Sequence, residues 1–218
     1  MTTHIFNSRF DRRTLLKGAA ALGAFQVTSP FIIPARGETP IRMGMIDPLT
    51  GVYAAPAGNE VMGAKLAVAR INAQGGILGR QVELLVEDSA NDVGTGVQKA
   101  RKLIERDQVN FIIGDVNSGI AAAIAQVTAE KKILHIVSGG HTDSITGKDC
   151  KWNVFRVCNT TRMEANSVSN VLFKKYGKKW HFITPDYAFS HTLYDACTDD
   201  LKKLGGTVTG NELTPLGT

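Results

Sequence analysis

The sequence predicts an α/β fold, with parallel sheets covered by helices on both faces. Short, continuously apolar runs such as 111–113 and 133–137 are typical of strands that are buried on both faces. They alternate with segments whose apolar residues recur at helical spacing, as strand–helix–strand units require. The polar, non-periodic stretch 138–152 interrupts this alternation, so we expect two blocks with a cleft between them.

The first block reads as strand and helix in strict alternation. Its expected strands are residues 41–46, 81–87, 111–113 and 133–137. Its expected helices are residues 61–71, 93–105 and 120–131, where apolar side chains return every three or four positions. Gly75 and Gly76 are expected to end the first helix, because glycine disfavours helix continuation.

The second block resumes the same alternation after the polar stretch. Its expected strands are residues 153–157, 180–184 and 207–211, and its expected helices are residues 163–176 and 190–204. We therefore expect an N-terminal α/β lobe over residues 38–150 and the start of a second lobe over residues 151–218.

Residues 1–37 are predicted to be a signal peptide. Arg12, Arg13 and Lys17 precede a short apolar segment, and a small-residue cleavage site ends it near Gly37. The paired arginines resemble the twin-arginine export signal, so we expect a periplasmic protein cleaved after about Gly37. The alternative, a basic arm that binds nucleic acid, does not explain the adjacent apolar run.

The net charge of +5 is concentrated in this N-terminal segment. The chain has 25 Lys and Arg and 20 Asp and Glu, of which residues 1–37 hold five basic and one acidic, leaving 20 and 19. A nearly neutral mature chain gives no ground for a nucleic-acid or anionic-membrane partner.

Three cysteines in an exported protein permit one disulfide and leave one thiol over. Cys197 shares a helical apolar stripe with Leu193 and Leu201, so we expect it to be buried and reduced. Cys150 and Cys158 flank a short extended segment and are the expected pair, although spacing alone does not show that their Cβ atoms meet.

The candidate binding residues follow the ends of the expected strands, where parallel sheets bind their ligands. Asn117 and Ser118 precede a helix, whose N-terminus favours a carboxylate, and either side chain could instead only cap that helix. In the next loop Gly139 and Gly140 allow close backbone approach, and His141 and Thr142 offer donors, although a loop histidine is often merely solvated.

The second block offers aromatic side chains at the equivalent strand-to-helix turn. Tyr187 and Phe189 can face a ligand from across the cleft, or they can serve only as a hydrophobic staple or cap at the start of the helix that follows. Signatures of catalysis are missing, since no glycine-rich phosphate loop and no nucleophile elbow occur. His135 reads as a core residue, and His191 with Asp195 lacks a third metal ligand. We therefore expect no enzyme, no cofactor and no metal site.

Several motifs together resemble the periplasmic leucine/isoleucine/valine-type substrate-binding proteins of ABC importers. They are the loop 49–51, the run 63–80, the strand ending at Glu87 and Asp88, and the segment 111–114 with Ser118. The string Ile-Asn-Ala-x-Gly-Gly-Ile-x-Gly at 71–79 is the most specific of them, and the similarity extends from residue 40 to 218.

This resemblance implies two Rossmann-like lobes that close on a small ligand and present it to a permease, with the receptor acting as a monomer. It implies that Ser118, the Gly139 backbone and His141 hold a carboxylate, and that Phe189 is a pocket aromatic. His141 stands where amino-acid binders often have threonine, and Tyr53 is close to the position of another family aromatic. The ligand is therefore expected to be an amino acid or an aromatic carboxylate or amide.

The resemblance also implies that the second lobe is incomplete, because family members continue with further strands. Two other functions remain open from the sequence. A ligand sensor would use the same fold with a receptor or kinase as partner, and a periplasmic hydrolase would need Ser118 and His141 to act as nucleophile and base.

Overall fold

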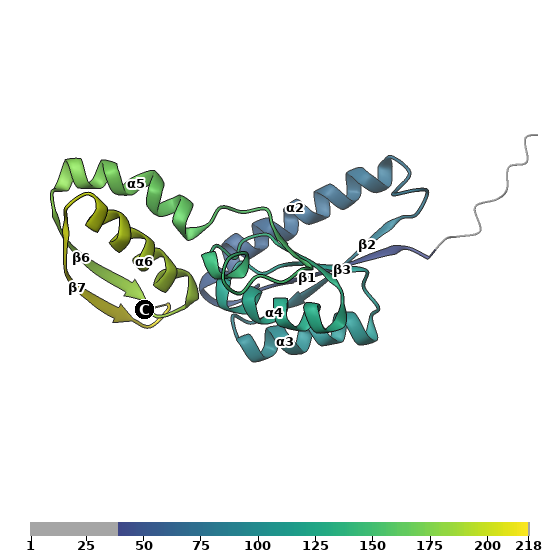
Figure 1. The fold of residues 1–218 in the computed structure, drawn as a ribbon. Helices are drawn as coiled ribbons and strands as arrows, with labels where there is room; N and C mark the ends of the chain where they lie inside the picture. The colour runs from purple at the N-terminus through teal and green to yellow at the C-terminus, as the bar shows by residue number, and fades with distance from the viewer. Residues whose placement is uncertain (1–38, 218) are drawn as a thin grey trace, which may run out of the picture. The chain divides into compact units, whose positions relative to one another are not determined.

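The computed structural model describes residues 39–217, and its elements follow the expected alternation (Figure 1). In chain order they are β1 (Ile41–Asp47), η1 (Gly51–Tyr53), α2 (Ala54–Ala73), β2 (Val82–Asp88), α3 (Val93–Arg101), η2 (Lys102–Arg106), β3 (Phe111–Gly114), α4 (Ser118–Lys131), β4 (Leu134–Val137), η3 (Asp143–Ile145), β5 (Val154–Arg156), α5 (Thr161–Tyr176), β6 (Lys179–Pro185), α6 (Ala188–Lys203) and β7 (Thr207–Thr214). None of the helices in this part of the chain has the length and apolarity needed to cross a bilayer. The predicted signal peptide lies outside the described residues.

The first sheet has five parallel strands in the order β2-β1-β3-β4-β5, and we call it and its helices the first lobe. Met45 of β1 is paired with Val86 on one side and Ile113 on the other, so β1 lies inside the sheet. The sequence placed the strand near 153–157 in the second block, and this was wrong, because β5 pairs with β4. Periodicity identifies a strand but not the sheet that it joins.

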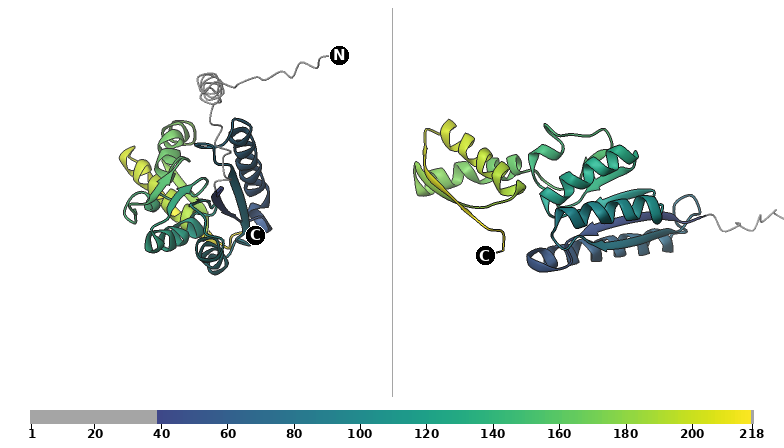
Figure 2. Two further views of the ribbon diagram at one scale, coloured as in Figure 1. Left: turned by 90° about the vertical axis from the view of Figure 1, so that its right-hand side faces the viewer. Right: turned by 90° about the horizontal axis from the view of Figure 1, so that it is seen from below.

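Helices cover the first sheet on both faces (Figures 1 and 2). On one face α2 packs on β1 and β2 through Val61, Ala64 and their neighbours. On the other face α3, η2 and α4 bury a cluster that contains Leu103, Ile112 and Ile120. This layering confirms the parallel α/β arrangement predicted from the apolar strands.

The start of helix α2 differs from the sequence prediction, whereas its end agrees with it. Helix α2 begins at Ala54, earlier than the expected start at residue 61. Pro56 is accommodated because first-turn amides need no intrahelical partner. Gly75 and Gly76 end α2 with φ of 95° and 80°, a conformation that favours glycine.

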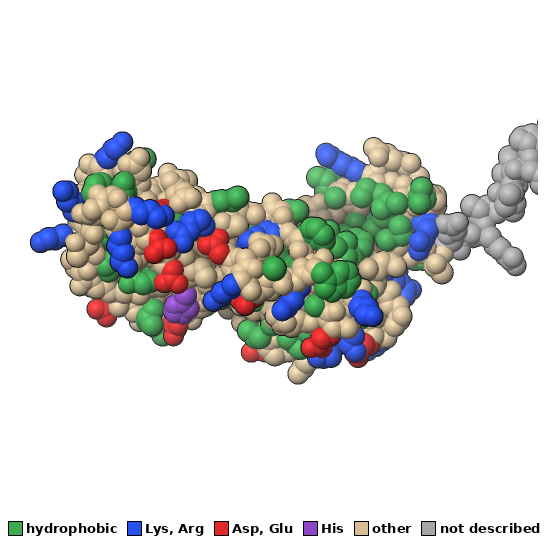
Figure 3. All heavy atoms as spheres, viewed as in Figure 1, with side chains coloured by type: hydrophobic (Ala, Val, Ile, Leu, Met, Phe, Trp, Pro, Cys, Tyr) green, Lys and Arg blue, Asp and Glu red, His purple; other side chains and the backbone are tan. Residues whose placement is uncertain are grey.

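The second lobe comprises α5, β6, α6 and β7, with β6 and β7 forming a parallel two-stranded sheet. Helices α5 and α6 pack on each other, and α6 packs on the sheet, where Phe182 meets Tyr194 edge to face at 5.0 Å. Acidic and basic side chains are interspersed over this lobe (Figure 3). They include the ion pair of Arg162 and Asp199 at 3.0 Å. The boundary after residue 150 itself stays a prediction, although β5, which lies beyond it in sequence, joins the first sheet.

The cysteine pairing expected from the sequence was wrong, because Cys150, Cys158 and Cys197 are all free thiols. The extended strand β5 lies between Cys150 and Cys158 and separates them, since an extended chain rises about 3.3 Å per residue. Cys158 instead donates to the Gly140 carbonyl at 3.6 Å. Cys197 is unpaired as expected but only half-buried, and its neighbour Leu201 fills the core position.

Candidate ligand-binding site

The site begins where three neighbouring strands of the first sheet end. β1 ends at Asp47, β3 at Gly114 and β4 at Val137, and parallel pairing brings these ends to one edge of the sheet. The loops that follow β3 and β4 carry most of the residues predicted to bind a ligand. Such strand ends are the usual ligand edge of open α/β sheets.

Asn117 is the residue that caps α4. Its Oδ1 accepts hydrogen bonds from the backbone N–H groups of Gly119 at 2.8 Å and Ile120 at 3.4 Å. Ser118 is therefore released from a capping role. Its hydroxyl oxygen accepts from the Thr142 amide at 3.1 Å, and the structure assigns its proton no acceptor among residues 39–217. That proton is available to a ligand at a helix N-terminus, where a negative charge is favoured.

The loop after β4 packs closely against α2, α4 and the loop after β3. A Cβ on Gly139 would lie 2.3 Å from Glu60 Oε1 and 2.9 Å from Val116 Cα, and one on Gly140 would lie 2.8 Å from the Ala121 Cβ. Both positions thus require glycine for close packing. Gly140 and Thr142, like Asn117, are not among the residues that line the cavity at this edge of the sheet, which differs from the predicted site.

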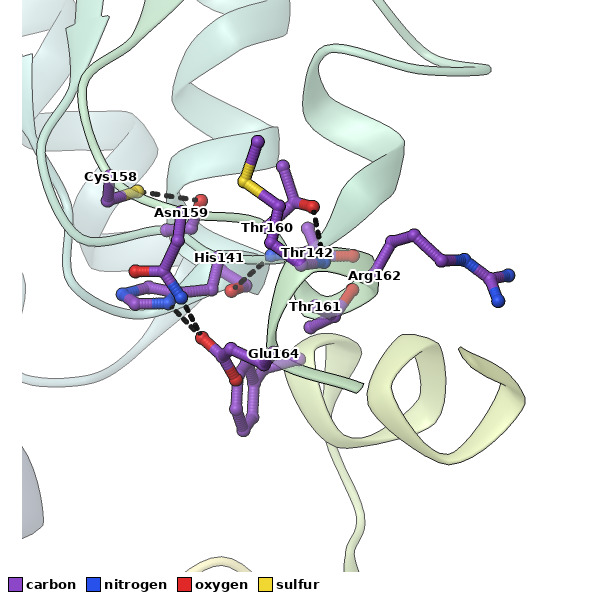
Figure 4. A network of polar contacts seen from close by, with 12 residues as sticks. His141, Thr142, Cys158, Asn159, Thr160, Thr161, Arg162 and Glu164 are labelled. Atoms are coloured by element: carbon purple, nitrogen blue, oxygen red, sulfur yellow. Dashed lines mark hydrogen bonds and ion pairs between the residues drawn. The ribbon is translucent and has the colours of Figure 1, made fainter. Parts of the chain in front are cut away.

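His141 is tied to the second lobe through Glu164. The His141 Nδ1 and Glu164 Oε1 atoms are 2.5 Å apart, and the Asn159 amide donates to the same oxygen at 2.6 Å (Figure 4). The His141 ring also meets the Phe189 ring edge-on, with centroids 5.9 Å apart. His141 is therefore held in place by a carboxylate and is not a freely solvated loop residue.

Three aromatic rings gather beside this pair. The centroids of Tyr53 and Tyr187 are 6.3 Å apart, and those of Tyr187 and Phe189 are 5.8 Å apart. Tyr53 lies at the entrance to α2, whereas the other two lie at the entrance to α6. The rings therefore come from both lobes, as the sequence led us to expect.

These groups enclose a cavity of about 170 Å³. It is lined by Tyr53, Val116, Ser118, Gly139, His141, Glu164, Tyr187 and Phe189. Six of them are predicted ligand-binding residues, so the structure brings most of the predicted set together. Val116 and Glu164 were missed. Glu164 is an acidic residue in the first turn of α5, and only the tertiary structure brings that turn to His141.

Behind the first-lobe side of the cavity lie three acidic residues that the sequence did not single out. Burial, reinforced by the negative charges of Glu60 and Asp115, raises the pKa of Asp47 to about 8. Burial also raises the pKa of Asp115 to about 7, although hydrogen bonds from the Asn117 amide and Ser89 partly oppose this. The pKa of Glu60 is raised by burial as well, against a hydrogen bond from Ser138.

These acids hold the binding loops. Asp47 Oδ1 accepts from the Val116 amide at 3.0 Å, and Asp115 accepts from the Asn117 amide at 2.7 Å. The Asp47 Oδ2 atom has no partner among the described residues. Because Val116 lines the cavity and Asn117 caps α4, the acids position the wall from behind and do not line it.

No metal site accompanies the cavity in the part of the chain that the structure describes, where no three His, Cys, Asp or Glu side chains are grouped to hold an ion. Another hollow, of about 290 Å³, is lined by Asp143, Ser144, Gly147, Lys148, Arg162, Thr192 and Asp195. It holds none of the predicted ligand residues and does not include the strand ends. The smaller cavity is therefore the better candidate.

The chain is similar to known proteins over most of its length. A family model described as periplasmic binding protein matches residues 40–218. The Leu/Ile/Val-binding protein BraC3 of Rhizobium johnstonii is 33% identical over 177 residues, which cover 80% of this chain and 48% of BraC3. The chain spans about half the length of such relatives.

Solved structures of periplasmic and solute-binding proteins are also similar to this chain. A periplasmic binding protein from Burkholderia mallei matches with a TM-score of 0.78 at 30% identity, covering 82% of this chain and 48% of that one. A solute-binding protein of an ABC transporter from Rhodopseudomonas palustris, in complex with 4-hydroxybenzoate, matches with a TM-score of 0.75 at 26% identity, covering 83% and 48%.

Proposed function

The chain belongs to the periplasmic binding protein family, and we propose that it is a non-catalytic solute receptor that delivers a small carboxylate-bearing ligand to an ABC importer. The observation that carries this proposal is the cavity at the strand ends, with the Ser118 hydroxyl at the N-terminus of α4. A carboxylate there would accept from that hydroxyl and would be favoured by the helix dipole.

The relatives support two ligand classes. BraC3 is named for leucine, isoleucine and valine, and the Rhodopseudomonas palustris protein was solved with 4-hydroxybenzoate. Both classes combine a carboxylate with an apolar body. The aromatic rings of Tyr53, Tyr187 and Phe189 would pack against that body.

Binding without catalysis is supported by the contacts of Ser118 and His141, the nucleophile and base that a hydrolase would use here. A hydrolase would need Ser118 hydrogen-bonded to His141. Ser118 instead accepts from the Thr142 amide, and His141 Nδ1 is engaged by Glu164. Within residues 39–217 no hydrogen bond joins Ser118 to His141, so the site lacks the geometry of an activated nucleophile.

We further propose that the protein works in the periplasm as a monomer, after export through the twin-arginine segment, and that an ABC permease is its partner. Family membership and the charge pattern of residues 1–37 support this assignment. Export can be tested by changing Arg12 and Arg13 to lysine together, which should leave the protein in the cytoplasm.

The proposal is tested by a thermal-shift screen of the purified chain against branched-chain amino acids, benzoates and short amides. A ligand that binds only the folded state raises the melting temperature. At a hundredfold excess over its dissociation constant it raises the free energy of unfolding by about 2.7 kcal/mol. Hits should be confirmed by calorimetry. A chain that is folded yet binds no carboxylate in this panel contradicts the proposal.

A further inference from the structure

Arg156 is a half-buried cation that lies directly behind the loop that carries His141. It ends β5, which pairs with β4, and the loop follows β4. Its Nη1 atom donates to the carbonyl oxygens of Gly140 at 3.2 Å and Thr142 at 2.6 Å. Its Nη2 atom donates to the Thr146 hydroxyl, and no carboxylate within residues 39–217 pairs with the guanidinium. The positive charge of Arg156 is therefore directed at the backbone of this loop.

The bonds from Arg156 orient the backbone on both sides of His141. The Gly140 carbonyl and the His141 N–H belong to one trans peptide group, so they point in opposite directions. Because Arg156 holds the carbonyl, the N–H points away from the guanidinium. His141 lines the cavity and Arg156 does not. The His141 N–H has no acceptor in the described part of the chain, so it is available to a ligand.

Other contacts hold the same loop in place. The His141 carbonyl accepts from the Thr161 amide at 2.9 Å (Figure 4), and the Thr142 amide donates to the Ser118 hydroxyl at 3.1 Å. The position of the loop thus does not depend on Arg156 alone. A substitution that keeps a polar side chain at residue 156 should mainly remove the charge.

The cavity needs a positive charge that its own lining does not provide. Among the described residues, those that line it include no lysine and no arginine, and they include the Glu164 carboxylate. A ligand carboxylate that leaves water without a compensating charge is strongly disfavoured. A guanidinium bonded to the carbonyl of a peptide group polarises that group, so the N–H at its other end becomes a stronger donor. The charge of Arg156 also acts directly, with less screening than in bulk water.

We propose that Arg156 is a positioning residue for carboxylate ligands, which supplies through the Gly140–His141 peptide group the positive charge that the cavity lining lacks. This inference rests on the proposed receptor function. Arg156 does not touch the ligand. It directs and polarises the His141 N–H, so the site distinguishes an anionic carboxylate from a neutral group of the same shape.

The test compares each carboxylate with the carboxamide of the same shape. Dissociation constants are measured by calorimetry for 4-hydroxybenzoate and 4-hydroxybenzamide, and for leucine and leucinamide. The wild-type chain should bind at least one carboxylate about ten to a hundred times more tightly than its carboxamide. Arg156→Gln keeps a donor but removes the charge. It should weaken binding of that carboxylate about tenfold and change the affinity for the carboxamide by less than about threefold.

The matched control is Arg42→Gln. Arg42 also donates to a backbone carbonyl, that of Asp107 at 3.0 Å, but it lies at the end of β1 that is remote from the cavity. This change should leave both affinities unchanged. Arg156→Lys keeps the charge without the planar guanidinium and should retain most of the preference for the carboxylate.

A measurement on the wild-type chain decides the matter even if a variant fails to fold. In NMR spectra of the backbone amides, the His141 amide proton should move downfield when the carboxylate is added. It should move less when the carboxamide is added, because a hydrogen bond to a charged acceptor is the stronger one.

Three results would overturn the inference and leave the receptor function standing. Equal losses for carboxylate and carboxamide in Arg156→Gln would make Arg156 only a structural clamp of the loop. Unchanged affinities for both would give it no part in binding. A His141 amide signal that does not respond to a bound carboxylate would remove the link between Arg156 and the ligand. Binding of none of these compounds would refute the receptor function together with this inference.

Discussion

The two walls of the cavity are built in different ways. The first-lobe wall, with Val116, Ser118 and Gly139, rests on a five-stranded sheet with helices on both faces. The second-lobe wall, with Glu164, Tyr187 and Phe189, comes from the first turns of α5 and α6 and the residue before α6. Its own sheet has two strands.

Burial and hydrogen bonding follow this difference. Ser118 is 1% exposed, and its loop is fixed from behind by Asp47 and Asp115. Glu164 is 27% exposed in its side chain and depends on two polar partners. Changes in the first wall should therefore alter the stability of the fold as well as binding, whereas changes in the second should alter mainly binding and the attachment of the second lobe.

Among single substitutions, the largest effect on stability is expected from Gly139→Ala. The new methyl group would meet Glu60 Oε1 at 2.3 Å and the Val116 backbone at 2.9 Å, so the free energy of unfolding should fall by about 2–3 kcal/mol. Urea unfolding followed by circular dichroism measures this.

Its control is Gly63→Ala on the exposed side of α2, where a Cβ would meet nothing within 4 Å. That change should stabilise the chain by about 0.5–1 kcal/mol, because alanine has the higher helix propensity. A Gly139→Ala variant as stable as wild type would mean that the first wall is looser than its contacts indicate.

The second effect is a dependence of stability on pH. Burial raises the folded-state pKa of Asp47 to about 8 from its ordinary value of 3.8. Between those values the folded chain keeps a proton that the unfolded chain releases. The free energy of unfolding should therefore fall as the pH rises from about 4 to about 8, by at most about 1.4 kcal/mol per pH unit for each such group.

Unfolding at pH 5 and at pH 8 checks this sign. Asp115, with its pKa raised to about 7, should contribute in the same direction over the lower part of the range. Asp47→Asn should flatten the dependence, because asparagine mimics the neutral acid, whereas the exposed Asp195→Asn should leave it unchanged. Greater stability at pH 8 than at pH 5 would contradict the account of a buried acidic wall.

The smallest effect is expected where the two lobes meet through hydroxyl groups. The Thr192 hydroxyl lies 3.0 Å from that of Thr142 in the first lobe and accepts from Thr161 at 3.0 Å. Thr192→Val should lower stability by about 1 kcal/mol and increase hydrogen exchange in α6. Thr198→Val, also in α6, removes a buried hydroxyl that has no hydrogen-bond partner among residues 39–217, and should be neutral or stabilising. Equal effects of the two changes would show that the Thr192 contacts contribute nothing.

The sequence predicted much of the first wall, because its signals are local. The loops after 111–113 and 133–137 are recognisable from apolar strands and turn residues, and the structure places Ser118, Gly139 and His141 together there. The relation of Glu164 to His141 is not local, since it depends on how the chain returns to the cavity after β5. Nothing in the spacing of these residues indicates their contact.

Other differences have similar causes. β5 has three residues, too few for a pattern that would assign it to one sheet. The expected disulfide failed because sequence spacing does not report where side chains point, and Cys158 points to the Gly140 carbonyl. Likewise, the carboxylates of Asp47, Glu60 and Asp115 lie close together only because β1 pairs with β3 and α2 packs on β1.

The most direct test of the central claim, that the cavity at the strand ends binds a carboxylate through Ser118, is calorimetric titration of Ser118→Ala with a confirmed ligand. Asn117 still caps α4, but the buried Thr142 amide loses its acceptor, so the melting temperature should fall while the fold is retained. Loss of a charge-assisted hydrogen bond of about 1.5–3 kcal/mol should weaken binding roughly ten- to a hundredfold. An unchanged dissociation constant, with or without a lower melting temperature, would contradict the claim.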